Sequence, residues 1–345
     1  MLNKLNIFDS SNIFSAILIP FLICCTGEYS GEMNDGFSSY PISKRMASWN
    51  DSIFLSYGLG IYTYGTYCLI PDANNNRLIQ LDTNLTFIRT IGKAGKGPNE
   101  FILPFQTIAW KDTIFTYDRA NKRINYHSLA GEYLGEIKTP PDVDFSGRMA
   151  IDDEFNLYMC TPKSSSSIMK FDLKGNILSR FGASRENYLS IRHLFWTEHN
   201  VLLSVGCVEP KIELYNTSGD LISSFNFEKI PEILAAIEDI KKIYAQNNYS
   251  WTSMFYSIIY DASYRNGKLY LLYRHNPRNP ENPQMMIGNQ LLVFNIFPDV
   301  YLENKVDLEP QGSERFYLSI AVDPQNTYLY AFENTTKEIC KFKIN

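Results

Sequence analysis

The stretch SIMKFDLKGNILSRFG, residues 167–182, decides the fold because it contains two strand-like runs around a turn. Apolar residues alternate with polar ones on both sides of Lys174-Gly175-Asn176, and this spacing is typical of β-strands with one buried face. The central tripeptide favours a hairpin turn. The stretch is therefore predicted to form two antiparallel strands.

The same pattern recurs along the chain. It appears as RLIQLDTNLTFIRTIG (77–92), RINYHSLAGEYLGEI (123–137), KIELYNTSGDLISSF (211–225) and QLLVFNIFPDVYLENKV (290–306), and its first half ends the chain as EICKFKIN (338–345). The residues that close the first strand are Leu81, Tyr126 or its neighbour His127, Phe171, Tyr215, Phe294 and Phe342, and with Tyr126 they lie 45, 45, 44, 79 and 48 residues apart. A period near 45 that is carried only by strand signals is typical of a β-propeller.

Each repeat also has an upstream pair of strands, as in RMAIDDEFNLYMCTP, residues 148–162. Four strands make one blade, so the six anchors predict an all-β, six-bladed propeller over residues 40–345. The last repeat stops before its fourth strand, and a segment within residues 40–50 is predicted to supply it. This closure would join the first and last blades and remove exposed strand edges.

The long interval predicts a helical insertion before blade five. Residues 228–247 carry apolar side chains at helical spacing, namely Ile233, Leu234, Ile237, Ile240 and Ile243. Pro231 lies near the start, where a helix tolerates proline. We expect an amphipathic helix packed on the propeller, with a lid or a partner contact as the alternative.

The amino terminus is predicted to be an export signal. The apolar run IFSAILIPFLICC, residues 13–25, is shorter than the roughly 20 residues of a membrane span. Its end, Leu22-Ile23-Cys24-Cys25, resembles a bacterial lipobox, although Cys24 stands where a smaller residue is usual. The resemblance implies a signal peptide over residues 1–24, lipidation of Cys25, and a lipid-anchored protein of the cell envelope. A plain cleaved signal or an uncleaved anchor is the alternative.

Residues 25–39 are polar and rich in glycine and serine, so they are expected to form a flexible tether. The other four cysteines, Cys68, Cys160, Cys207 and Cys340, show neither CxxC nor zinc spacing and are expected to be buried free thiols. Aromatic residues make up 14% of the chain, which favours strands. The net charge of −5 argues against a nucleic-acid partner.

The glycine-rich stretch IGKAGKGPNEF, residues 91–101, is not a phosphate loop. Gly97 and then Pro98 follow Gly95-Lys96, so the serine or threonine that a P-loop needs is absent, and Glu100 breaks the dinucleotide pattern G-x-G-x-x-G. The stretch is predicted to connect blade one to blade two. Glu100 is expected to cap loop amides and Phe101 to lie between the blades, while Lys93 and Lys96 are exposed candidates for an anionic partner.

The same stretch carries a resemblance to a family. Gly92, Gly95, Gly97, Pro98, Glu100 and Phe101 match the turn G-x-x-G-x-G-P-x-E-[FY] that recurs in six-bladed, NHL-like β-propeller lipoproteins of Bacteroidetes. The resemblance covers about residues 40–345 and includes the lipobox, but it departs at the helical insertion. It implies the fold and export, and it implies little about activity.

A ligand site is expected at the mouth of the central channel. Counting back from the anchors places Gln106, Arg148 and His193 at the starts of inner strands. The other candidates, from the remaining blades or beside these positions, are Tyr62, Arg192, Tyr256, Arg315 and Tyr317. Such a polar, aromatic and cationic mouth suits a glycan, a peptide carboxylate or another anion. The alternative is that these groups satisfy one another or bind channel water.

Catalytic residues are not indicated. None of the four histidines has metal-ligand spacing, no G-x-S-x-G elbow is present, and no metal or cofactor is predicted. Asp118 and Arg119 resemble an acid–base pair, but the pattern recurs at Asp72 and is expected to shape a hairpin. We therefore expect a monomeric binding module for a glycan, peptide or partner protein. The alternative is a lyase or hydrolase acting on an envelope or dietary polymer.

Overall fold

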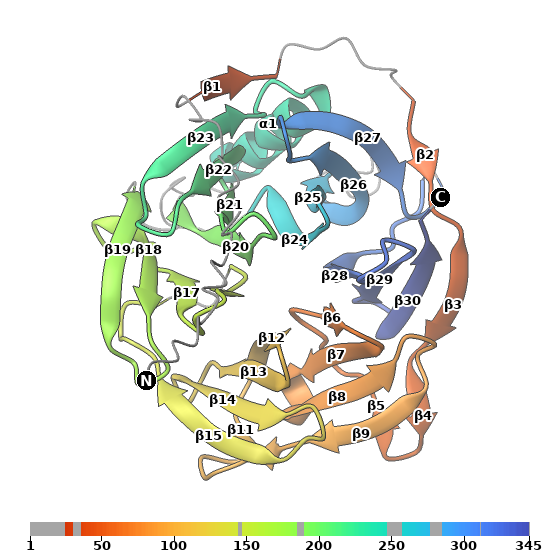
Figure 1. Cartoon of the computed structure of the whole chain (residues 1–345). Helices are drawn as coiled ribbons and strands as arrows, with labels where there is room; N and C mark the ends of the chain where they lie inside the picture. The colour runs from red at the N-terminus through yellow and green to blue at the C-terminus, as the bar shows by residue number, and fades with distance from the viewer. Residues whose placement is uncertain are drawn as a thin grey trace, which may run out of the picture.

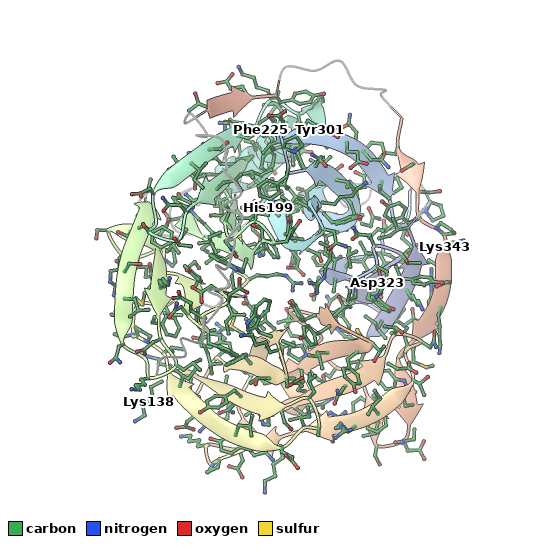
Figure 2. The ribbon with its side chains drawn as sticks, in the orientation of Figure 1. Lys138, His199, Phe225, Tyr301, Asp323 and Lys343 are labelled. Carbon is green, nitrogen blue, oxygen red and sulfur yellow. The ribbon has the colours of Figure 1, made fainter. Side chains whose placement is uncertain are left out.

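The structure, a computed structural model, describes residues 25–29, 36–143, 147–184, 190–246, 257–276, 285–310 and 312–344. Six four-stranded antiparallel units form a ring around a central channel (Figure 1). The prediction of a six-bladed β-propeller is confirmed. Side chains fill the spaces between the blades, whereas Lys138 and Lys343 lie at the outer rim (Figure 2).

In blades one to five the strands run from the channel outward in chain order, while the outermost strand of blade six comes from the amino-terminal side of the chain. Blade one contains β6 (Tyr62–Tyr64), β7 (Tyr67–Asp72), β8 (Arg77–Asp82) and β9 (Phe87–Ile91). Blade two contains β12 (Pro104–Trp110), β13 (Thr113–Asp118), β14 (Arg123–Ser128) and β15 (Tyr133–Lys138). Blade three contains β16 (Ala150–Ile151), β17 (Leu157–Cys160), β18 (Ser166–Phe171) and β19 (Ile177–Ala183).

The second half of the ring repeats this order. Blade four contains β20 (Arg192–Trp196), β21 (Leu202–Gly206), β22 (Lys211–Tyr215) and β23 (Leu221–Asn226). Blade five contains β24 (Ile259–Arg265), β25 (Lys268–His275), β26 (Ile287–Asn295) and β27 (Tyr301–Asp307). Blade six contains β28 (Tyr317–Val322), β29 (Tyr328–Glu333), β30 (Glu338–Lys343) and β3 (Ile42–Met46). Short elements between them are β4 (Ser48–Asn50), β5 (Ile53–Phe54), η1 (Ala73–Asn75), β10 (Lys93–Ala94) and β11 (Glu100–Phe101).

The amino-terminal strand closes the ring as predicted. β3 pairs antiparallel with β30, with Arg45 opposite Cys340 and Met46 opposite Ile339. We had expected this closure to remove the exposed strand edges, and that expectation was wrong. Within its blade, each fourth strand pairs only on its inner side, so its outer edge stays open to other partners. Two of these edges are covered by parallel strands, β1 (Cys25–Glu28) on β23 and β2 (Ser38–Ser39) on β27.

The segment expected to be a flexible tether, residues 25–39, therefore lies against the propeller at both of its ends. The middle of this segment lies outside the described residues. The same is true of the proposed signal peptide, residues 1–24, which includes the first three lipobox positions. Within the described ranges, no helix is both long and apolar enough to cross a membrane.

The repeat anchor in blade two is His127, and the choice of Tyr126 was wrong. In blades one to five the pairing of the third strand with the fourth has a bulge directly before the anchor residue. In blade two this bulge lies between Tyr126 and His127, so His127 is the residue equivalent to the other anchors. His127 is fully buried between the rings of Phe101 and Tyr133. An imidazole thus takes a position that the other repeats give to an apolar side chain.

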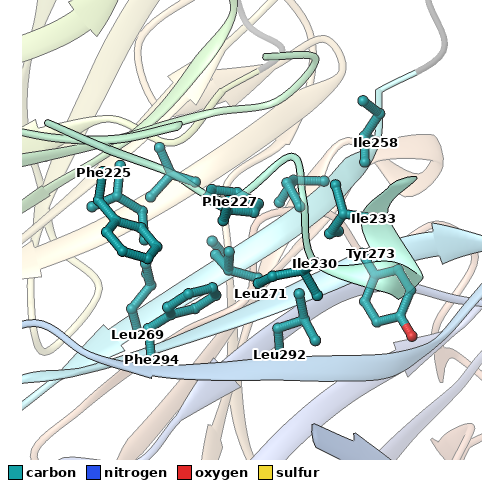
Figure 3. Close-up of a cluster of buried hydrophobic side chains, with 14 of the residues drawn as sticks. Phe225, Phe227, Ile230, Ile233, Ile258, Leu269, Leu271, Tyr273, Leu292 and Phe294 are labelled. Atoms are coloured by element: carbon teal, nitrogen blue, oxygen red, sulfur yellow. The ribbon is translucent and has the colours of Figure 1, made fainter. Parts of the chain in front are cut away.

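The predicted insertion is helix α1 (Pro231–Gln246), which packs on blades four and five. Ile233 is buried in one cluster with Phe227, Leu271 and Phe294 (Figure 3). Ile237 belongs to the same cluster. Leu234, which the sequence placed on the apolar face, is 44% exposed instead. The four cysteines Cys68, Cys160, Cys207 and Cys340 are buried free thiols, as expected.

Candidate functional site

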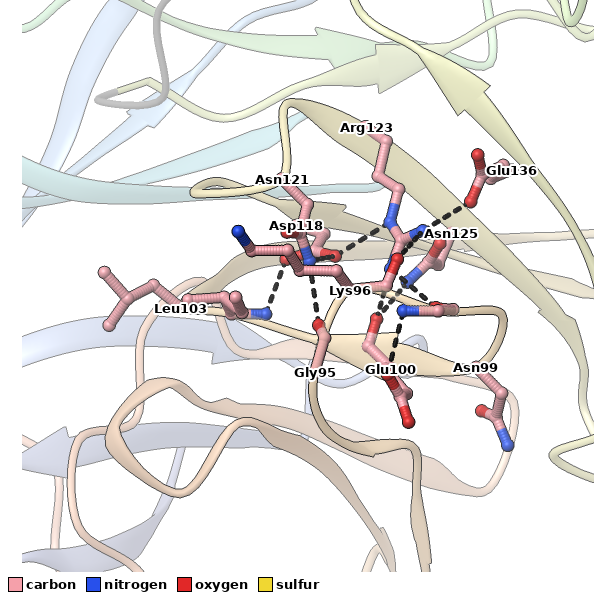
Figure 4. Close-up of polar contacts among 12 residues, drawn as sticks. Gly95, Lys96, Asn99, Glu100, Leu103, Asp118, Asn121, Arg123, Asn125 and Glu136 are labelled. Carbon is pink, nitrogen blue, oxygen red and sulfur yellow. Dashed lines mark hydrogen bonds and ion pairs between the residues drawn. The ribbon is translucent and has the colours of Figure 1, made fainter.

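The glycine-rich connection between blades one and two is held by Arg123 of β14 (Figure 4). Its guanidinium donates to the carbonyl oxygens of Lys96 at 3.0 Å, Gly97 at 2.8 Å and Glu100 at 2.7 Å. The carboxylate of Glu100 in turn accepts the Gly97 N–H at 2.8 Å, as predicted. That bond, followed by the charge of Lys93, keeps the pKa of Glu100 below its usual value.

This network explains why the stretch is not a phosphate loop. A phosphate loop aims its amides at the ligand, whereas here several carbonyls face Arg123 and the Gly97 amide is used by Glu100. Gly92 has φ +76°, and a Cβ there would lie 2.3 Å from the ring of Phe101. The buried Phe101 ring thus requires glycine at position 92, and the motif specifies a blade connection.

Asp118, which ends β13 just before the β13–β14 hairpin, has a structural role, as the sequence indicated. Asp118 binds Arg123 at 3.0 Å and accepts the Ile102 N–H at 2.8 Å, and Asp72 binds Arg77 at 3.2 Å. The basic partner lies five residues after the aspartate in both blades. Arg119 is therefore not the partner of Asp118 in this ion pair.

Inside the channel, Arg148 and Asp261 form a buried ion pair that spans the ring. The Arg148 guanidinium donates to the two carboxylate oxygens at 2.7 and 2.6 Å, and both side chains are 7% exposed. It also donates to the carbonyls of Ile61 at 2.8 Å and Ile320 at 2.6 Å. One side chain from blade three thus binds blades one, five and six, and we call this pair the channel bar.

The bar satisfies backbone groups that the propeller leaves open. Innermost strands have one edge facing the channel, and unpaired buried amides are costly. Asp261 accepts the Ile320 N–H at 2.8 Å, and beside the bar Gln106 accepts the Met149 N–H at 2.9 Å. Burial alone would raise the pKa of Asp261, but Arg148 and the hydrogen bond from the Ile320 N–H hold it below its usual value.

His193 lies beside the bar and is neutral at pH 7. Its Nδ1 lies 3.2 Å from the Arg148 backbone N–H and accepts from it, so Nε2 carries the proton. Burial lowers the pKa of His193 to about 4, an effect that Asp261 opposes and Arg148 reinforces. Three of the predicted site residues, Gln106, Arg148 and His193, are therefore brought together.

These three residues line a cavity of about 330 Å³ on the side where the inner strands begin, which we call the vestibule. Sequence reasoning missed most of its wall. The additional lining residues are Tyr57, Leu59, Gly60, Phe105, Arg119, Ser257, Tyr260, Asp261, Arg274 and Leu318. Asp261 was missed because the long β25–β26 connection shifts the count in blade five, and Arg274 was missed because it lies on the second strand, β25.

Two arginines of the vestibule lie against aromatic rings. The Arg274 guanidinium is 4.4 Å from the centre of the Tyr260 ring, and its Nε donates to the Ser257 carbonyl at 3.1 Å. The Arg119 guanidinium is 5.8 Å from the centre of the Phe105 ring. Burial and the neighbouring Tyr260 raise the pKa of Tyr57, while Arg119 opposes the rise. The wall therefore combines cations with aromatic faces.

The other predicted site residues lie elsewhere. Tyr62 lines a separate cavity on the opposite side of the bar. Arg192 is buried between blades and pairs with Glu213 at 2.9 Å. It precedes His193, and successive strand residues point to opposite faces. Arg315 pairs with Glu338 at 3.2 Å.

Tyr317 is also fully buried and donates to Glu309, so it does not reach the vestibule. Tyr256 lies outside the described residues. Over the described part of the chain, no three His, Cys, Asp or Glu side chains come close enough to hold a metal ion.

Comparisons with known proteins agree on the fold. A family described as "6-bladed beta-propeller" matches residues 50–179, which is less than half of the chain. No curated protein matches the sequence significantly.

Solved structures are similar at low identity. A Bacteroides fragilis protein assigned as exported has a TM-score of 0.61 and 15% identity, covering 92% of this chain and 98% of its own. An inactive histidine-to-alanine variant of virginiamycin B lyase from Staphylococcus aureus, solved with quinupristin, has a TM-score of 0.52 and 10% identity, covering 84% and 80%. A streptogramin B lyase has a TM-score of 0.52 and 13% identity, covering 88% and 98%. At these identities the likeness shows the fold alone.

Proposed function

We propose that this chain is a ligand-binding module of the cell envelope, and that its vestibule binds the carboxylate of a glycan or peptide. The observation that carries the proposal is the pair Arg119 and Arg274, which come from blades two and five and lie on aromatic rings at one cavity. Arginine binds carboxylates through two parallel hydrogen bonds, and an aromatic face holds the guanidinium plane in position.

The charge of the vestibule supports an anionic ligand. Its described lining contains three arginines, Arg119, Arg148 and Arg274, and one carboxylate, Asp261. The whole chain has a net charge of −5, so this gathering of arginines is not a general property of the protein. A concave site of one sign concentrates ligands of the opposite sign.

The size and polarity of the vestibule also fit a small ligand or the end of a larger one. Its volume of about 330 Å³ lies at the low end of ligand pockets. Tyr57, Phe105 and Tyr260 supply flat apolar surface beside the charges. Such a wall can pack on the ring of a sugar or on a peptide side chain.

Location in the envelope, as a lipid-anchored monomer, is part of the same proposal. It is supported by the apolar run of residues 13–25 and by its lipobox-like end at Cys25. The likeness to a Bacteroides fragilis protein assigned as exported agrees with it, although the likeness concerns the fold.

An enzymatic role is the second candidate. Two of the similar structures are streptogramin-type lyases, and His193 lines the vestibule with its neutral imidazole. The low identity transfers no activity to this chain. Release of products from a bound ligand by the purified protein would favour the enzyme.

A screen on arrays of carboxylated and neutral glycans and peptides tests the proposal. We expect ligands with a carboxylate to bind the wild type, and binding to fall at least about tenfold in Arg119→Met/Arg274→Met, because hydrogen bonds to charged groups contribute about 1.5–3 kcal/mol. Arg180→Met is the control, since Arg180 pairs with Asp142 on the outer surface at 2.6 Å. Circular dichroism checks the fold of each variant. Equal binding by the double variant would remove the vestibule from the proposal.

A further inference from the structure

A second cavity lies on the opposite side of the channel bar, where the inner strands end. Its volume is about 140 Å³, and it shares Arg148 with the vestibule as a common wall. Aromatic side chains from four blades surround it, namely Tyr62, Trp110, Phe195, Trp196 and Tyr264. We call this cavity the aromatic slot.

The walls of the aromatic slot are fixed by contacts within the protein. The Trp196 ring stacks on Tyr158, with centroids 5.7 Å apart and an interplanar angle of 16°. The Tyr264 hydroxyl donates to the Glu198 carboxylate at 2.9 Å. Arg265 lies 5.0 Å from the centre of the Tyr62 ring and donates to the Val322 carbonyl at 3.2 Å. A cavity with such fixed walls loses little freedom when it binds a ligand.

We propose that the aromatic slot binds one uncharged pyranose ring, as a free sugar or the end of a glycan. A dry cavity of about 150 Å³ accommodates benzene, so a slot of about 140 Å³ has room for one six-membered ring. The C–H face of a pyranose packs on an aromatic ring, and its hydroxyls are donors and acceptors. The slot offers both surfaces, because Glu198 and Arg265 share the wall with the tryptophans.

The charged groups decide between a sugar and an apolar ring of similar size. The Glu198 side chain is 46% exposed, so water can reach its carboxylate. An apolar ring would displace that water without replacing its hydrogen bonds, which is costly. Sugar hydroxyls can replace them. The slot lining holds one carboxylate, Glu198, beside Arg148 and Arg265, so benzoate is included among the probes to test an anion there directly.

Tryptophan fluorescence of the full-length protein tests this inference. Trp110 and Trp196 line the slot, while Trp49 lies outside it and donates its N–H to the Leu85 carbonyl at 2.7 Å. The probes are the methyl pyranosides of glucose, galactose, mannose and N-acetylglucosamine, with p-cresol and benzoate for comparison. We expect at least one glycoside to change the fluorescence with a millimolar dissociation constant, and Trp49→Phe to bind like the wild type.

Two variants link the signal to the slot. Glu198→Ala removes a carboxylate that is 46% exposed, and Trp110→Phe removes part of one wall. Circular dichroism checks the fold of both, because Glu198 also accepts from the Tyr264 hydroxyl. We expect each to weaken the glycoside at least about tenfold, as measured by calorimetry as well as by fluorescence. Binding of p-cresol or benzoate alone would overturn the assignment to a sugar. No response to any probe, or glycoside binding unchanged in both variants, would overturn the site, while the array screen judges the vestibule separately.

Discussion

Replacing Asp261 with asparagine removes the negative half of the channel bar while nearly keeping its shape. Arg148 would then keep its charge in a position where its side chain is 7% exposed. Its other hydrogen bonds, to carbonyls of blades one and six, would hold the guanidinium in this buried position. Removing one partner of a buried ion pair costs about 3–5 kcal/mol, and we expect Asp261→Asn to lose this amount of unfolding free energy.

Urea unfolding followed by circular dichroism measures the change, with the slope compared between variants. The control is Arg180→Met, which breaks a pair of similar length, 2.6 Å, whose side chains are 31% and 29% exposed. Exposed pairs contribute less than about 1 kcal/mol, so the control should stay within that range. A loss below about 1 kcal/mol for Asp261→Asn would refute the reasoning.

A double replacement separates the pair from its surroundings. Exchanging a buried ion pair for apolar side chains of similar volume is often neutral, whereas breaking it leaves an uncompensated charge. Arg148→Met/Asp261→Leu should therefore be more stable than Asp261→Asn in the same urea assay. A double variant that loses the sum of its two single losses would show that the two residues act independently.

Three further changes test other parts of the fold. Gly92→Ala should lose more than about 1 kcal/mol in urea unfolding, because φ is +76° and the new Cβ would meet the Phe101 ring; a neutral effect would contradict this fit. The pKa of His193 is lowered to about 4 in the folded protein, below its unfolded value of about 6.5, so the unfolded chain binds the proton first as the pH falls. His193 should therefore reduce the free energy of unfolding by about 2 kcal/mol between about pH 7.5 and 5. Comparison of the wild type with His193→Gln across this range measures it, and parallel stability curves would exclude it. Ile237→Ala in α1 should cost about 2–5 kcal/mol while the exposed Leu234→Ala stays within about 0.5 kcal/mol, and equal losses would mean that α1 does not pack as described.

The architecture follows from the sequence because each blade repeats one local pattern. Alternating apolar residues and turn signals mark the outer hairpins from Leu81 to Phe342, and the missing last strand points to residues 40–50. The misplaced anchor at Tyr126 shows the limit of this pattern. A buried histidine, here His127, reads as polar in a hydrophobicity pattern although it packs like an aromatic residue.

The site was predicted only in part, for reasons that concern blade geometry. Counting back from the anchors found Gln106, Arg148 and His193 because blades two to four have hairpins of similar length. The count failed at Asp261, where the β25–β26 connection is longer. Arg119 lies in the hairpin that follows β13, and Arg274 lies on β25, the second strand of blade five. Both line the vestibule, but a count along the innermost strands cannot find residues at these positions.

The measurement that tests the central claim most directly uses one ligand with and without its charge. The strongest carboxylated binder from the array and its carboxamide analogue are titrated into the wild-type protein by calorimetry. The proposed vestibule predicts that the carboxamide binds at least about tenfold more weakly, and that added salt weakens only the carboxylate. Equal affinity of the two compounds, with no effect of salt, would contradict an arginine-lined anion site.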